Sequence, residues 1–150
     1  MQEVSFYQLK RHSVEKALLR LLEKAVAGGK RAVVRAASAE EAEALDTALW
    51  AVDQDSFLPH GNKQSKNWET QPVFLTETAD NPNKAEFVFV LPGAPAEGLE
   101  GFERIFFIFE GDAEAQVEAA RERWKAFKKK GGKLSYWTQT DSGKWEQKQG

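Results

Sequence analysis

The sequence predicts an α/β fold: a three-layer domain in which helices cover both faces of a mostly parallel, Rossmann-like central sheet. Three observations lead to this prediction. Helical and strand-like patterns alternate along the chain. The first helical segment separates two strand-like segments, an order typical of a parallel crossover connection. The segment Ile105–Phe109 is apolar throughout, as expected of a central strand covered on both faces.

The individual elements follow from residue spacing and from start and stop signals. Runs rich in strand formers predict strands at residues 4–7, 31–36, 73–76, 87–90, 105–109 and 134–137, the last pairing with residues around Trp145. Apolar residues spaced by three or four predict helices from Ser13 to Gly28, from Ser38 to about Trp50 and from Asp112 to about Lys130. Ser38 with Glu41 forms a capping box, and Asp112 is the expected cap of the last helix. The polar stretch 51–72 is expected to be a long surface loop.

Length and composition restrict the class of protein. We expect one domain over residues 1–150, and 41% hydrophobic residues are enough to build its core. The formal charge of −2 argues against a general nucleic-acid polycation. The absence of cysteine excludes a disulfide framework, a cysteine nucleophile and a thiolate metal site. With no signal-peptide pattern and no apolar run near the ~20 residues that span a bilayer, we expect a soluble, cytoplasmic protein.

Catalytic motifs are not evident. His12 and His60 do not have the spacing of metal ligands, and the neighbouring Asp53 and Asp55 are more simply read as solvated loop carboxylates. Gly28–Lys30 follows a helix and precedes a strand, the reverse of a phosphate-binding loop. The sequence therefore predicts no catalytic residue, no metal and no cofactor. A nucleotide-dependent enzyme on a Rossmann-like sheet is the weakest of three functional hypotheses.

The strongest local signal is a cluster of positive charge near the C-terminus. Residues 121–133 contain seven basic residues and one acidic residue, Glu122, a formal charge of +6. Part of this pattern has a structural explanation. Basic residues at a helix C-terminus interact favourably with the helix dipole, and each stabilises the helix by roughly 0.3–1 kcal/mol. That effect does not require so many bases. The alternatives are a docking site and a merely solvated basic face.

Helical spacing arranges this charge as a stripe. One face carries Val117, Arg121, Lys125 and Lys128 or Lys129. Trp124 and Phe127 lie mostly on the neighbouring face, which can pack on the sheet. A basic stripe beside apolar side chains suits a ligand with two parts, an acidic stretch and a hydrophobic end. Arginine can hold a carboxylate through two parallel hydrogen bonds, and lysines add longer-range attraction.

Four segments, in this order and at these separations, resemble a known family. They are Val4-Ser-Phe-Tyr7, Leu45-Asp-Thr-Ala-Leu-Trp50, Asp55-Ser-Phe-Leu-Pro-His60 and Arg121-Glu-Arg-Trp-Lys-Ala-Phe127. The chain resembles the chi subunit of bacterial DNA polymerase III holoenzyme, and the segments span nearly its whole length. No single motif is specific, but their ordered combination is.

The resemblance implies a non-enzymatic accessory subunit of the clamp-loader assembly. Such a subunit binds the psi subunit on one side and, on another, the acidic C-terminal tail of single-stranded DNA-binding protein, which ends in Pro-Phe. By position, Arg121 holds the terminal carboxylate, Lys125 faces the acidic residues of the tail, and Trp124 shapes the site for phenylalanine. Val117 stands where the family carries a further basic residue. This departure either weakens the charge contact or moves it to Lys128 or Lys129.

The resemblance also implies a psi-facing surface, at Trp50, Phe57, Pro59 and His60. Trp50 and Phe57 have an alternative reading as ordinary core aromatics, since large aromatic residues are usually well buried. The second functional hypothesis is direct binding of single-stranded nucleic acid by the same basic stripe, with Trp124 or Trp137 as a stacking platform. The acidic net charge argues against it.

Overall fold

A computed structural model describes residues 3–10, 14–52, 60–61, 73–78, 84–94, 97–99, 101–131, 133–140 and 144–148. The helices in these ranges are α1 (Val14–Ala27), α2 (Ala39–Val52) and α3 (Glu114–Lys129). The strands are β1 (Glu3–Leu9), β2 (Ala32–Arg35), β3 (His60–Gly61), β4 (Val73–Thr76), β5 (Phe87–Val90), β6 (Arg104–Glu110), β7 (Lys133–Gln139) and β8 (Trp145–Lys148). They form one sheet in the order β3-β4-β2-β5-β6-β1-β7-β8.

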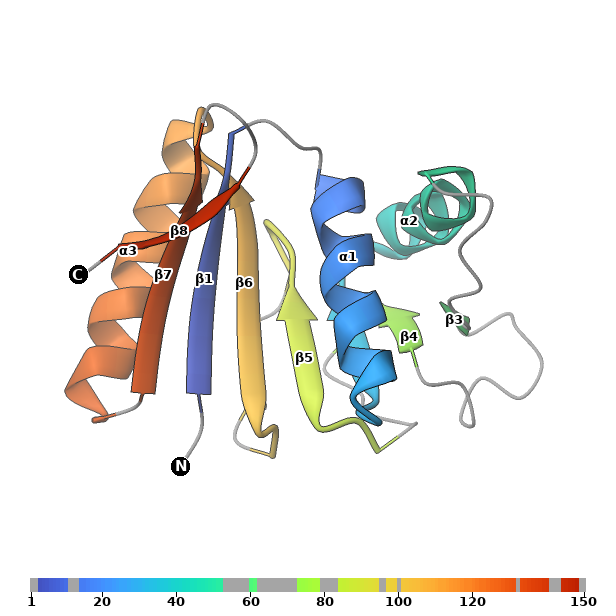
Figure 1. The fold of residues 1–150 in the computed structure, drawn as a ribbon, viewed down its shortest axis with the longest axis horizontal. Helices are drawn as coiled ribbons and strands as arrows, with labels where there is room; N and C mark the ends of the chain where they lie inside the picture. The colour runs from blue at the N-terminus through green and yellow to red at the C-terminus, as the bar shows by residue number, and fades with distance from the viewer. Residues whose placement is uncertain are drawn as a thin grey trace.

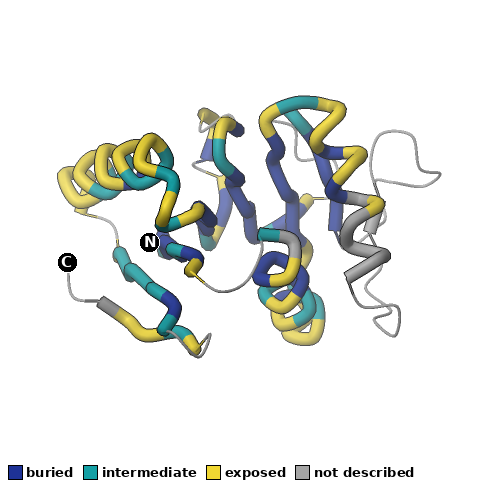
Figure 2. Tube along the Cα trace, turned by 90° about the horizontal axis from the view of Figure 1, so that it is seen from above, coloured by how far each residue is buried: buried dark blue, intermediate teal, exposed yellow. Residues whose placement is uncertain are grey.

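The sheet lies between helices, as the sequence predicts. We call the face covered by α1 the front face and the face covered by α3 the back face (Figure 1). On the front, α1 and Leu45 of α2 pack against Tyr7, Phe89 and Phe106. On the back, Ala120 of α3 belongs to a second apolar cluster. Seen from above, α1 and α3 lie on opposite sides of the buried central strands (Figure 2). The three-layer α/β prediction is confirmed.

Strand pairing shows what a local pattern cannot predict. Every neighbouring pair in the sheet is parallel except β7–β8. β1 and β2 flank α1 in sequence and are parallel, but β6 and β5 lie between them. β4 and β5 are likewise separated by β2. The expected hairpin of residues 134–137 with the region of Trp145 is present as β7–β8. The segment expected as one loop contains the two-residue strand β3, which pairs with β4.

The predicted cap of α3 is wrong by one residue. Ala113, not Asp112, has the extended N-cap conformation, with φ −95° and ψ 97°, and makes no side-chain capping bond. A turn after β6 sets this position, because the Ala113 amide donates to the Glu110 carbonyl at 3.2 Å. The side chain of Gln116 accepts a hydrogen bond from the Glu110 amide at 2.8 Å. This bond ties the first turn of α3 to the end of β6. The capping bond predicted for α2 is present, since the Glu41 amide donates to Ser38 Oγ at 3.1 Å.

Aromatic packing fixes α3 on the back face. Phe6, in β1, is fully buried. Its ring centroid lies 5.0 Å from that of Phe107, 5.4 Å from Trp124 and 6.1 Å from Tyr136. Phe6 therefore joins β6, β7 and α3 through a single side chain. Such pairs contribute about 0.5–1.5 kcal/mol each beyond the burial of apolar area.

Replacing Phe6 with alanine is expected to lower the free energy of unfolding by about 3–5 kcal/mol, because the substitution leaves a cavity beneath α3. Chemical denaturation followed by circular dichroism measures this change. Lys128→Ala, an exposed position on the same helix, serves as the control and is expected to stay within about 0.5 kcal/mol. A loss below 1 kcal/mol for Phe6→Ala would contradict the central role of this side chain.

Candidate functional site on helix α3

Helix α3 presents three different surfaces around its axis. The packing row, Val117, Ala120, Trp124 and Phe127, lies against the back face of the sheet. At 100° per residue, Arg121 and Lys125 fall on one flank of this row. Arg123 and Gln116 fall on the opposite flank. The two flanks are therefore separate surfaces, divided by side chains that are packed on the sheet.

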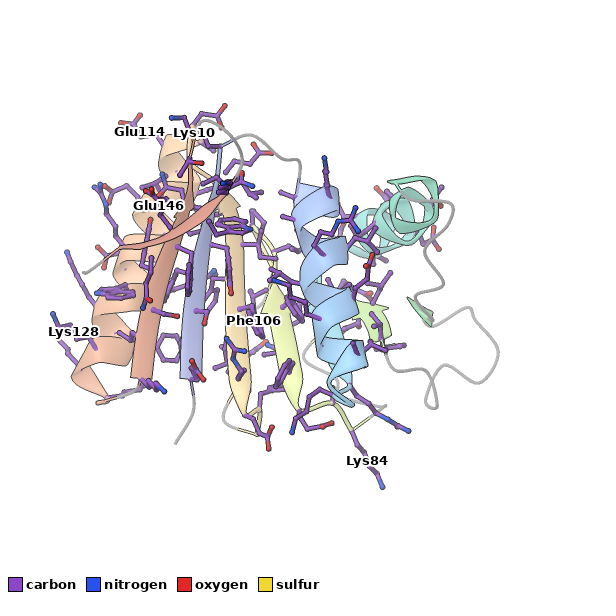
Figure 3. All side chains as sticks on the ribbon, viewed as in Figure 1. Lys10, Lys84, Phe106, Glu114, Lys128 and Glu146 are labelled. Atoms are coloured by element: carbon purple, nitrogen blue, oxygen red, sulfur yellow. The ribbon has the colours of Figure 1, made fainter. Side chains whose placement is uncertain are left out.

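The stripe of Arg121, Lys125 and Lys128 is exposed along its length. Arg121 is 65% exposed and lies 3.5 Å from the carboxylate of Glu118, which is 63% exposed. Ion pairs in such a position contribute little, about 0–1 kcal/mol, so an incoming carboxylate can replace Glu118 at small cost. Within the described ranges, Lys125 and Lys128 have no carboxylate partner. Lys128 points away from the sheet (Figure 3).

An aromatic pair borders this stripe. Trp124 is half-buried, and its ring meets that of Tyr136 edge to face, with centroids 5.8 Å apart. The Tyr136 hydroxyl donates to the side chain of Gln8. Burial raises the pKa of Tyr136, and the positive charge of Arg121 partly opposes that shift. Arg121 lies three residues before Trp124 on α3, so the cation borders the aromatic pair on the same side of the helix.

The structure brings together the residues predicted for the tail site. Arg121, Trp124, Lys125 and Lys128 are neighbours on one side of α3, whereas Val117 is half-buried and packs on the back apolar cluster. Position 117, where the resemblance implies a basic residue, therefore presents apolar surface in this chain.

Trp137 does not belong to this surface. It lies in the front cluster, stacked on Tyr7 with ring centroids 6.2 Å apart. Of the two stacking platforms considered for nucleic acid, Trp124 or Trp137, the alternative of Trp137 is wrong, because alternate residues of β7 face opposite sides of the sheet.

The structure describes only part of the surface that was predicted to face psi. Trp50 lies in α2 and His60 in β3, but their side chains lie outside the described part of the structure. Phe57 and Pro59 lie outside the described residues altogether. What the structure does place is the backbone of α2 and β3, at the opposite edge of the sheet from α3 and β7 (Figure 1).

Two residues beside α3 were missed from the sequence. Tyr136 could have been found by extending strand alternation, which puts Leu134 and Tyr136 on one face of β7. Its position beside Trp124 still depends on the pairing of β7 with β1. Arg123 lies inside the basic run and had no signal of its own. Its guanidinium is over the Phe107 ring, 4.9 Å from the centroid.

Two other kinds of feature are absent from the described residues. Over the described ranges, no three His, Asp or Glu side chains gather in an arrangement that could hold a metal ion. The helices in those ranges also include none with the length and apolar character needed to cross a membrane.

The fold and the stripe together define an α/β protein with an exposed surface of cations and aromatic rings. Comparison with known proteins identifies its family. The family model described as DNA polymerase III chi subunit, HolC, matches residues 1–135. The chain is also 31% identical over 91 residues to the probable DNA polymerase III subunit chi of Rickettsia prowazekii, a match covering 61% of this chain and 55% of that protein. The match thus spans about half the length of this curated relative.

The chain belongs to the DNA polymerase III chi subunit family.

The effect of Arg121 on Tyr136 is directly measurable. The chain has two tyrosines, so in a Tyr7→Phe background the ultraviolet titration of tyrosinate reports Tyr136 alone. Arg121→Gln is expected to raise the pKa of Tyr136 further, because it removes the charge that favours the phenolate. Arg123→Gln, on the other flank, is the matched control and should leave this pKa unchanged. Equal shifts in the two variants would show that Arg121 does not face Tyr136.

Proposed function

We propose that this chain is a non-catalytic adaptor of DNA polymerase III that bridges the psi subunit to the acidic C-terminal tail of single-stranded DNA-binding protein. The observation that carries the proposal is the surface on α3, where exposed cations border a half-buried aromatic pair. A tail with several acidic residues and a terminal Pro-Phe has two matching parts. The acidic residues complement the stripe, and the terminal ring complements the aromatic pair.

Each residue of this surface has a distinct task in the proposal. Arg121 exchanges its weak pairing with Glu118 for the terminal carboxylate, which a guanidinium can hold through two hydrogen bonds. Lys125 and Lys128 attract the acidic residues upstream. Trp124 and Tyr136 contact the proline and phenylalanine rings. Val117 adds apolar contact instead of charge.

The sheet keeps the proposed partner sites apart. The tail site lies on α3 and β7, whereas Trp50 and His60 belong to α2 and β3 at the other edge. Both partners therefore have room to bind at once.

Isothermal titration of the tail peptide should give the same affinity with the chain alone and with its psi complex. A large loss of affinity in the complex would contradict the bridging arrangement.

A peptide with acidic residues and a C-terminal Pro-Phe is expected to bind. The substitution Arg121→Gln is expected to lower the affinity for this peptide about tenfold or more. The reason is the loss of charge-assisted hydrogen bonds, worth about 1.5–3 kcal/mol. Fluorescence anisotropy of the labelled peptide gives the dissociation constants.

Arg20→Gln on α1 is a matched control for this experiment. Arg20 is 56% exposed and also pairs with a glutamate three residues away at 3.5 Å, but it lies on the front side of the molecule. It should not change the affinity. Equal effects of the two substitutions would refute the assignment to Arg121. If a naked oligonucleotide bound as tightly as the peptide, the basic stripe would be a nucleic-acid surface instead.

Restoring a cation at position 117 tests the charge complementarity separately. Val117→Lys is expected to increase tail affinity several-fold at low salt, because the ammonium can extend from the packing row to the stripe. Val117→Gln, similar in polarity but uncharged, is the control. The gain should shrink as salt is raised, since exposed charges are screened over about 8 Å at physiological ionic strength. A gain that persists in high salt would indicate a contact other than charge.

A further inference from the structure

A pocket of about 230 Å³ lies on the flank of α3 opposite the stripe. It sits between the helix, the carboxyl-terminal halves of β5 and β6, and the turn that follows β5. Its walls include Val90, Pro92, Phe107, Phe109, Ala119 and Arg123. The packing row of α3, whose Ala120 forms part of the wall, separates it from Arg121 and Lys125. No residue of the proposed tail site lines it.

The space results from small side chains on the helix. Three alanines, Ala115, Ala119 and Ala120, form the helix side of the pocket, and their short side chains leave space beside β5 and β6. Ala119 itself is exposed, so the pocket is open to solvent at the helix surface. At about 230 Å³ it is smaller than the roughly 300–1,000 Å³ of sites for drug-sized ligands. It has room for one amino-acid side chain but not for a nucleotide.

Among the described residues that line the pocket, Arg123 is the only one with a charged side chain. Its guanidinium lies over the Phe107 ring at 4.9 Å, half-buried, and has no carboxylate partner among the residues that the structure describes. Burial lowers the pKa of Arg123, which reflects the cost of removing its charge from water. An anion beside it would offset that cost.

Gln116 is a second donor. Its carbonyl oxygen accepts from the Glu110 amide at 2.8 Å, which leaves its NH₂ group without a partner in the described ranges. It is seven residues from Arg123, so the two donors are about 10 Å apart along α3, with Ala119 between them. The described part of the pocket wall thus offers side-chain donors at both ends, apolar atoms in the middle and no acidic side chain.

We propose that this pocket binds a ligand that has a free carboxylate and one apolar side chain on the same carbon, with the carboxylate on Arg123 and the apolar group against Ala119 and Phe109. The C-terminal residue of a polypeptide and a free apolar amino-acid derivative share this chemistry. The site is independent of the proposed tail site because Arg121 and Arg123 lie on opposite flanks of one helix.

Nuclear magnetic resonance titration of the full chain tests the proposal. N-acetyl-leucine in the millimolar range should shift the amide signals of Gly93 and Ala119, and N-acetyl-leucinamide, which lacks the carboxylate, should bind at least tenfold more weakly. Arg123→Gln should also weaken the binding of N-acetyl-leucine at least tenfold. Ala119→Leu, a good helix former placed in the pocket, should abolish binding even if Arg123→Gln fails to fold. Arg121→Gln is the matched control and should leave binding unchanged.

The source of the carboxylate is decided by a second titration. A short peptide ending in leucine that binds more tightly than N-acetyl-leucine assigns the pocket to a polypeptide C-terminus, and the reverse order assigns it to a free small molecule. Absence of shifts at Gly93 and Ala119 would overturn the proposal. So would equal binding of the acid and the amide, or equal losses in Arg121→Gln and Arg123→Gln.

Discussion

The aromatic packing between α3 and the back of the sheet determines what the rest of the helix can do. Phe6 of β1 contacts Phe107, Trp124 and Tyr136 at once, so β6, β7 and α3 are held by one buried ring. That contact fixes the rotation of α3 about its axis. With the rotation fixed, Arg121 and Lys125 must face solvent on the β7 side. Arg123 must face the ends of β5 and β6.

The same rotation gives the two arginines different electrostatic environments. Arg121 is exposed and weakly paired, so its longer-range attraction for an acidic partner is screened by salt and contributes mainly to the association rate and to specificity. Arg123 is half-buried over Phe107, where a charge interacts more strongly with a single well-placed anion. The basic run is therefore two surfaces and not a uniform patch.

Short-range patterns were enough to predict much of this arrangement. Helical spacing alone placed Arg121 and Lys125 together beside Trp124, and apolar runs located the central strand β6. Features that depend on distant pairing were not accessible. The order of the strands puts β6 and β5 between β1 and β2, and Tyr136 meets Trp124 only because β7 pairs with β1. The cap of α3 was misplaced because a turn bonded to Glu110, and not side-chain capping, sets where the helix begins.

The covered sheet also limits where partners can bind. β2, β5 and β6 are buried along nearly all of their length, so the middle of the sheet has little surface to offer (Figure 2). The accessible polar groups lie on the outer sides of the helices and toward the two edges of the sheet. A partner on α3 and a partner on α2 or β3 are then separated by the width of strands that are packed on both faces. Because densely packed interiors deform little, such a sheet can hold two partners at a fixed separation.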